Sequence, residues 1–270
     1  MNKNKPFLKW AGNKYRCLEQ ILSAFTLSQR LIEPFTGSGA VFMNSNAKHF
    51  LLAEQNYDLI NLYTLVQQLG VEFIDYCERY FEDRYNNETE FYRLRELFNR
   101  SKHSRKRAAL FVYLNRHAYN GLCRYNQSGN FNVPFGRYKK PYFPRKEMLA
   151  FYQQSQRAEF LHADFRTTFK QAVPGDLIYC DPPYVALSAS ANFSAYTRQS
   201  FSNLDQITLA KLAMKSAKKG INVIISNHDT EFTREQYRQA SIVSFPVQRL
   251  ISCKANQRHR VQELLAVFKG

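Results

Sequence analysis

The sequence has no apolar run long enough to cross a bilayer and no apolar segment within its first ten residues, so neither a membrane span nor secretion is expected. Its cysteines are few and scattered, with no Cys-x-x-Cys pair and no Cys/His cluster of zinc-ligand spacing; they are Cys17, Cys77, Cys123, Cys180 and Cys253. These absences predict free thiols, no metal site and a cytoplasmic location.

Acidic residues are also scarce, since 22 Asp and Glu face 38 Lys and Arg, for a net charge of +16. Such an excess predicts a polyanionic partner. Nucleic acid is favoured over an acidic membrane because no basic amphipathic helix stands out, and it implies association with the nucleoid. An apolar content of 44% over 270 residues is enough for one large domain, or for a domain with a sizeable insertion.

One stretch combines a buried strand with reactive groups. Residues 177–180 are apolar and β-prone, and Asp181-Pro182-Pro183-Tyr184 follows at once. Prolines cannot continue a central strand, so the acid, the rigid carbonyls and the ring fall where α/β sheets bind ligands. Asp181 and the Pro182 carbonyl can accept hydrogens from an exocyclic amine, while Tyr184 stacks on a base. The plain alternative is a strand end followed by a proline turn.

A second stretch predicts a nucleoside-bearing cofactor. A strand at 31–33 leads into a glycine turn at 36–39, and a second strand at 50–54 ends in Glu54, where an acid accepts ribose hydroxyls. The third glycine of the dinucleotide pattern is missing, and no Lys-Ser/Thr marks a P-loop. Further strands are expected at 160–164, 177–180, 221–226, 242–245 and 263–268, and helices at 15–25, 40–46, 145–156, 166–172 and 204–219.

Between these strands lies a helical insertion, with helices expected at 58–68, 71–81, 88–99 and 105–115. Residues 117–143 then interleave aromatics, asparagines and cations, which predicts a loop with a hairpin around 128–130. Side chains of these kinds read bases, hold phosphates and wedge into a duplex. A solvated basic loop is the alternative. The Ser- and Ala-rich segment 185–202 is expected to form a mobile lid. His228 is expected to have a structural role.

Segments 9–14, 33–39 and 181–184, in this order and with a recognition segment before the last, resemble the DNA adenine-N6 methyltransferases of the GATC-specific Dam family. The resemblance covers nearly the whole chain. It implies an α/β fold with the Rossmann-like, seven-stranded mixed sheet of S-adenosylmethionine-dependent methyltransferases. The catalytic domain would comprise residues 1–56 and 147–270, with a DNA-recognition domain inserted at 57–146. The resemblance implies that the methyl donor is converted to S-adenosylhomocysteine, that the partner is double-stranded DNA and that the enzyme is a monomer. The enzyme would serve replication, mismatch repair or restriction–modification.

By position, the resemblance also implies roles for individual residues. The methyl donor would contact Trp10, Lys14, Phe35, Gly37, Gly39, Glu54, Asp164, Phe165 and Asp181. The DNA would contact Lys9, Leu122, Arg124 and Pro134 as base readers, Tyr119 and Asn120 as the inserting pair, and Asn132, Arg137 and Tyr138. Three departures from the family pattern are Glu54 in place of Asp, Asn13 in place of Gly, and a divergent tail after Ser252.

The catalytic hypothesis is a direct methyl transfer in which Asp181, Pro182, Pro183 and Tyr184 hold adenine N6 so that its lone pair is freed from the ring. Cys180 precedes the acid inside the strand and does not follow a proline, which argues against methylation at cytosine C5. Two alternatives remain open at this point: an RNA adenine methyltransferase, and a basic nucleic-acid-binding module without catalysis.

Overall fold

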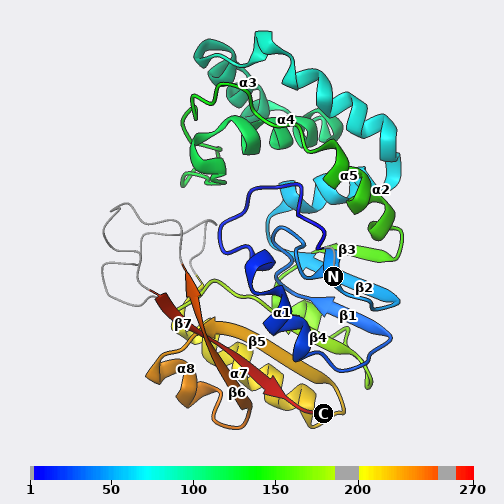
Figure 1. The fold of residues 1–270 in the computed structure, drawn as a ribbon, viewed down its shortest axis with the longest axis vertical. Helices are drawn as coiled ribbons and strands as arrows, with labels where there is room; N and C mark the ends of the chain where they lie inside the picture. Colours follow the sequence, from blue (N-terminus) through cyan, green and yellow to red (C-terminus); the bar gives the residue numbers. More distant parts are fainter. Residues whose placement is uncertain (1–2, 186–200, 249–259) are drawn as a thin grey trace.

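The structure is a computed structural model that describes residues 3–185, 201–248 and 260–270. Its described residues form one mixed sheet of seven strands in the order β3-β2-β1-β4-β5-β7-β6 (Figure 1). The strands are β1 Arg30–Glu33, β2 His49–Glu54, β3 Ala158–His162, β4 Leu177–Cys180, β5 Asn222–His228, β6 Ser241–Gln248 and β7 Arg260–Phe268. Strands β1 to β5 are parallel, and β7 runs antiparallel between β5 and β6. The predicted α/β methyltransferase sheet is confirmed.

The described helices are α1 Leu18–Ser23, α2 Tyr57–Glu78, α3 Glu88–Arg100, α4 Ser104–His117, α5 Arg145–Ser155, α6 Phe165–Phe169, α7 Asn203–Ala217 and α8 Glu231–Gln236. Short 3-10 turns are η1 Lys14–Arg16, η2 Phe42–Asn44, η3 Arg79–Phe81, η4 Asp83–Tyr85 and η5 Tyr119–Gly121. Figure 1 shows α3 and α4 at the end of the molecule away from β5, β6 and β7.

Strand β4 shows why the sequence of a central strand is continuously apolar. All four of its residues are buried. Leu177 and Tyr179 pack into the core on one face of the sheet, while Ile178 and Cys180 pack into the core on the other. Covered on both sides, the strand has no polar face, as expected of a parallel sheet.

Two helix predictions were wrong in detail. The segment 40–46 forms only the short turn η2, and 15–25 is divided into η1 and α1. The break expected between the helices 58–68 and 71–81 is present, because α2 is interrupted by a kink at Gly70, whose backbone is non-helical with φ 52° and ψ −126°. A side chain at Gly70 would meet the Tyr152 ring at 2.8 Å, so glycine is required both by the bend and by the contact.

Helix α2 joins the sheet to the helical end of the molecule. It contacts β3 and α5 on the sheet side and α4 beyond. Tyr63 on α2 packs its ring against Phe151 and Phe160, with centroids 4.6 and 5.6 Å away. One hydrophobic cluster therefore extends from Leu31 in the sheet to Phe111 in α4. The division at residues 57 and 146 stays a prediction, and the shared core indicates that the two parts fold together.

Some expectations fall outside the described residues. Residues 186–200 of the proposed lid, Cys253, and residues 249–259 of the divergent tail are among them. The cysteines that the structure does describe, Cys17, Cys77, Cys123 and Cys180, are buried and form no disulfide. Among the described helices none is long and apolar enough to span a membrane. The described side chains also contain no group of three His, Cys, Asp or Glu that could hold a metal ion.

Candidate active site and nucleic-acid face

Four neighbouring parallel strands each end at or near an acid. Glu33 ends β1 and Glu54 ends β2, while Asp164 follows β3 and Asp181 follows β4. Because the strand order is β3-β2-β1-β4, the acids follow one edge of the sheet in the order Asp164, Glu54, Glu33, Asp181. With strands about 4.8 Å apart, this row spans about 14 Å. The edge is where open α/β sheets bind ligands, and the row fits an elongated cationic one.

Asp181 is held by a lysine from the N-terminal segment. Lys14 Nζ lies 2.9 Å from Asp181 Oδ1, with the two side chains 8% and 21% exposed. The same ammonium donates to the Gly12 carbonyl at 2.8 Å and sits 4.4 Å from the centre of the Tyr184 ring. Burial raises the pKa of Asp181 from 3.8 to about 6, Lys14 acts against that rise, and Glu263 adds to it. The carboxylate can therefore exchange a proton near neutral pH.

The rest of the predicted tetrapeptide is also fixed in place. Pro182 is buried and Pro183 exposed, and the Tyr184 hydroxyl donates to Glu263 Oε2 on β7 at 3.0 Å. The rings of His228 and Tyr184 pack in a T-shaped arrangement, with centroids 4.8 Å apart and planes at 77°. Lys14, Glu263 and His228 thus fix the Tyr184 ring, a flat group that could pack against a flat ligand.

Glu33 is the most unusual group in the row. Its side chain is only 2% exposed, and its Oε1 has no hydrogen-bond partner among the described residues. Burial, and then the nearby charge of Asp181, raise the pKa of Glu33 well above its ordinary value of 4.5. A buried carboxyl oxygen without a partner costs free energy, so Glu33 Oε1 is the oxygen in this row that has a hydrogen-bond position left for another group.

The glycine turn and Glu54 form one unit. Glu54 Oε2 accepts from the Gly37 N–H at 3.2 Å, and Oε1 accepts from the N–H groups of Gln55 and Asn56 at 2.9 and 3.2 Å. Burial raises the pKa of Glu54, and these three donors act in the opposite direction. Tyr63 donates to the Gly37 carbonyl at 2.6 Å. Glu54 thus holds the turn that the ligand would approach.

Glycine is needed in this turn for two reasons. Gly37 and Gly39 have φ of 48° and 71°, in the left-handed region that favours glycine. A Cβ at Gly37 would also lie 3.1 Å from Nε1 of Trp10, so the indole covers the turn. Trp10 and Gly37 are therefore brought together, although they are far apart in the chain.

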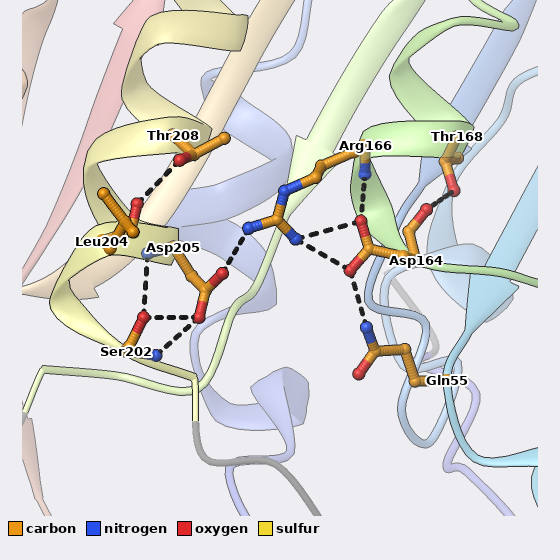
Figure 2. A network of polar contacts seen from close by, with 8 residues as sticks. All are labelled: Gln55, Asp164, Arg166, Thr168, Ser202, Leu204, Asp205 and Thr208. Carbon is orange, nitrogen blue, oxygen red and sulfur yellow. Dashed lines mark hydrogen bonds and ion pairs between the residues drawn. The ribbon is translucent and has the colours of Figure 1, made fainter.

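Asp164 and Phe165 close the other end of the row. The Phe165 ring is 1% exposed and stacks on Phe35, with centroids 5.5 Å apart. Gln55 donates to Asp164 Oδ2 at 2.7 Å, and the N–H of Arg166 donates to Oδ1 at 2.8 Å. Figure 2 shows the Arg166 guanidinium bridging Asp164 and Asp205 at the start of α7. This end of the site is a packed, hydrogen-bonded wall.

The recognition segment contains two strained positions. Asn120 and Arg137 are the non-glycine residues of the described chain with positive φ, at 52° and 53°. Strain of this kind collects at functional sites. The N–H of Tyr119 donates to the Pro134 carbonyl at 2.9 Å, so the predicted inserting pair and one predicted base reader lie side by side. Tyr119 is 53% exposed and Asn120 is exposed as well, as expected for side chains that enter a partner.

The predicted hairpin is present. Tyr125 and Phe131 form an antiparallel bridge, and Asn126 N donates to the Asn130 carbonyl at 2.9 Å. Arg124 is exposed on this hairpin, and its Nε donates to Asn132 Oδ1 at 2.8 Å. One terminal nitrogen of Arg124 also lies 3.5 Å from the Asn132 carbonyl, so Asn132 orients the exposed guanidinium.

Tyr125 ties the hairpin to the sheet side of the molecule. Its hydroxyl donates at 2.7 Å to Asp58 in the first turn of α2, and Arg107 pairs with the same carboxylate. Leu122 is half-buried and packs against the main cluster, so it lies in the base of the loop.

Lys9 lies against the recognition loop and helix α4. The Asn115 amide accepts from Lys9 N at 2.9 Å and donates to Lys9 O at 2.6 Å. The Lys9 ammonium sits 4.3 Å from the centre of the Tyr138 ring. Burial and then Arg116 lower the pKa of Lys9. Arg137 is exposed and contacts Glu88 at 3.3 Å. All predicted nucleic-acid contacts thus come from the N-terminal segment and one loop.

Sequence reasoning missed three contributors to this site. The sequence places Glu33 in the motif 33–39 but assigns it no role, although Glu33-Pro34 repeats the acid–proline strand end of Asp181-Pro182 on the adjacent strand. For Glu263 the sequence predicts only the start of a strand. Arg166 gave no sequence signal, because its partners Asp164 and Asp205 become neighbours only in the fold.

Known proteins resemble this chain over its whole length. Residues 10–251 match the family described as D12 class N6 adenine-specific DNA methyltransferase. The DNA adenine methylase of Serratia marcescens is 48% identical over 270 residues, covering 100% of both chains. The DNA adenine methylases of Escherichia coli K12 and Vibrio cholerae serotype O1 are 45% identical over 269 residues, covering 100% and 99% of this chain and 97% of each relative.

Proposed function

The chain belongs to the D12 class of N6 adenine-specific DNA methyltransferases, and we propose that it methylates a flipped-out adenine within GATC, using S-adenosylmethionine. The observation that carries this proposal is the arrangement at the end of β4, where Asp181, paired with Lys14, and two proline carbonyls precede a Tyr184 ring that is fixed by Glu263 and His228. The family favours duplex DNA over RNA, and an enzyme over a module that only binds.

The row of acids fits S-adenosylmethionine, a donor that carries two positive charges and a nucleoside. Asp164 would border its adenine and Glu54 its ribose, while Asp181 and the unpartnered oxygen of Glu33 would accept from its ammonium. When bound, the donor supplies a methyl group on a sulfonium, from which a nucleophile can displace it. Trp10 would cover the bound donor from the glycine turn.

The chain's own groups act on the adenine amine. Asp181 Oδ and the Pro182 carbonyl would accept the two N6 hydrogens, which draws the nitrogen toward tetrahedral geometry and frees its lone pair. Tyr184 would stack on the ring and exclude water from one face. A carboxylate whose pKa is about 6 can also take the proton that N6 releases after transfer.

The loop beside Tyr119 and Asn120 would recognise the DNA sequence. Arg124 presents a guanidinium whose fork matches O6 and N7 of guanine, and Lys9, Leu122 and Pro134 would contact the neighbouring bases. Tyr119 and Asn120 would fill the space that the adenine leaves. A net charge of +16 supports association with chromosomal DNA. The monomeric state stays a prediction.

Arg124→Ala tests the base-reading role. Methylation of GATC is compared with methylation of duplexes altered at each single position. Loss of base reading should cost about 1–3 kcal/mol and relax discrimination at one guanine position. If Arg124 only clamps a phosphate, all duplexes slow equally and the salt slope falls by about one. Arg100→Ala is the matched control, because Arg100 is an exposed arginine on α3 paired with Glu96, outside the loop.

A further inference from the structure

The Pro182-Pro183 pair creates a problem of backbone support. Neither proline has an N–H, so this part of the chain can be held only through its carbonyls or through the N–H groups that follow. Two buried amides provide that support. Gln206 Nε2 donates to the Pro183 carbonyl at 2.8 Å, and Val185 N donates to Asn227 Oδ1 at 3.2 Å.

These two contacts fall on the peptide groups immediately before and after Tyr184. The Pro183 carbonyl belongs to the peptide group that precedes the Cα of Tyr184, and the Val185 N–H belongs to the peptide group that follows this Cα. Holding both peptide planes fixes the backbone dihedral angles of Tyr184 and hence the direction of its ring. The same anchors limit rotation of the adjoining Pro182 carbonyl.

The Asn227 amide has all of its hydrogen-bonding capacity in use. Its oxygen accepts from Val185 N and from His228 N at 2.9 Å, and its nitrogen donates to Gln206 Oε1 and to the Tyr237 hydroxyl, both at 3.0 Å. A flipped amide would turn its NH₂ toward two N–H donors, so only one orientation is possible. Gln206 and Asn227 are 2% and 0% exposed.

The first turn of α7, which carries Gln206, is also linked to the side of the site where the methyl donor is proposed to bind. Ser202 and Asp205 cap the start of α7 reciprocally, and Arg166 links Asp205 to Asp164 (Figure 2). One end of α7 therefore touches both the wall at Asp164 and the carbonyl at Pro183. A displacement of this turn would move both sides of the site together.

We propose that Gln206 and Asn227 are positioning residues for methyl transfer, which hold the two peptide groups around Tyr184 so that Pro182 and Tyr184 meet the adenine in register. This inference rests on the proposed roles of the Asp181–Tyr184 segment. It predicts that the pair controls the rate of transfer from bound substrates, and that it contributes little to binding either of them.

Gln206→Met is the first test, since methionine keeps the volume and removes the hydrogen bonds of Gln206 to the Pro183 carbonyl, Asn227 and Tyr237. The expected result is a loss of about 10- to 100-fold in kcat, with KM for GATC duplex and for S-adenosylmethionine changed by less than about threefold. Gln67→Met is the matched control, because Gln67 also donates to backbone carbonyls, those of Ser155 and Ala158, away from the site. Gln206→Met with kcat within about twofold of the parent overturns the inference, as does an equal loss in Gln67→Met.

Gln206→Glu is the second test and does not depend on tolerance of methionine. A protonated glutamic acid can donate to the Pro183 carbonyl as glutamine does, whereas the carboxylate can only accept and would repel it. The ratio of its kcat to that of the parent should therefore fall as pH rises through the pKa of the new carboxyl. A ratio that is independent of pH contradicts the proposed contact.

The two tests separate this inference from the proposed function. If the parent enzyme does not methylate GATC, the function is wrong, whatever the variants do. If the parent is active and Asp181→Ala is inactive, but Gln206→Met and Gln206→Glu match the parent at every pH, then only the positioning role fails.

Discussion

The pKa of Asp181 makes a directional prediction about the pH dependence of methylation. Its carboxylate must be ionised to accept a hydrogen from the adenine amine, and burial has raised its pKa from 3.8 to about 6. The active form is therefore present above pH 6 and is lost as pH falls through that value. The value of kcat/KM for the methyl donor should rise with pH between 5 and 7 and then level off.

The size of the effect follows from the same values. A group with a pKa of about 6 is about one-tenth ionised at pH 5 and nine-tenths ionised at pH 7, so kcat/KM should change about tenfold. An aspartate at the ordinary value of 3.8 would be almost fully ionised at pH 5, and the profile would be nearly flat.

Two neighbours should shift this profile in opposite directions. Lys14→Met removes the charge that lowers the pKa of Asp181, so the inflection should move up by about one pH unit or more. Glu263→Gln removes a charge that raises it, so the inflection should move down. Lys14→Arg keeps the charge and serves as the control. A flat parent profile between pH 5 and 7, or a shift of the same sign in Lys14→Met and Glu263→Gln, would refute this electrostatic account.

Two further predictions concern the ligands. Glu54→Gln should weaken S-adenosylmethionine binding about tenfold or more without altering sequence preference, because an amide cannot accept from Gly37, Gln55 and Asn56 on both of its atoms. Calorimetry with Glu54→Asp as the charge-preserving control decides this, and an unchanged dissociation constant removes Glu54 from the site. DNA affinity should fall steeply with salt, with a log–log slope of about −0.9 for each phosphate neutralised. A nearly flat titration between low and physiological salt would contradict the role assigned to the net charge of +16.

The parts of the fold that could be predicted are those with a local sequence pattern. The apolar run 177–180 and the strand ends at Glu54 and Asp164 are visible in sequence, because parallel strands are buried on both faces and end at polar groups. The hairpin near Gly129 was predicted for a similar reason. The prediction of a helix at 40–46 was wrong, because these apolar residues are buried around the short turn η2 and do not form a helix.

The parts of the site that were missed depend on long-range contacts. Glu263 reaches Tyr184 from β7, which returns antiparallel beside β5 after the rest of the sheet is complete. Gln206 and Asn227 support the segment from a different helix and strand, and neither lies in a motif. Amides in such positions look like ordinary polar residues until burial shows that they are fully enclosed.

The central claim is tested most directly by transfer of a labelled methyl group from S-adenosylmethionine to a duplex containing one GATC site, with a scrambled duplex beside it. The parent should label N6 of the GATC adenine and leave the scrambled duplex unlabelled. Asp181→Ala should reduce the labelling by about 100-fold or more while its affinity for the GATC duplex is largely kept. Equal labelling of the two duplexes, or an Asp181→Ala variant within about tenfold of the parent, would contradict the account.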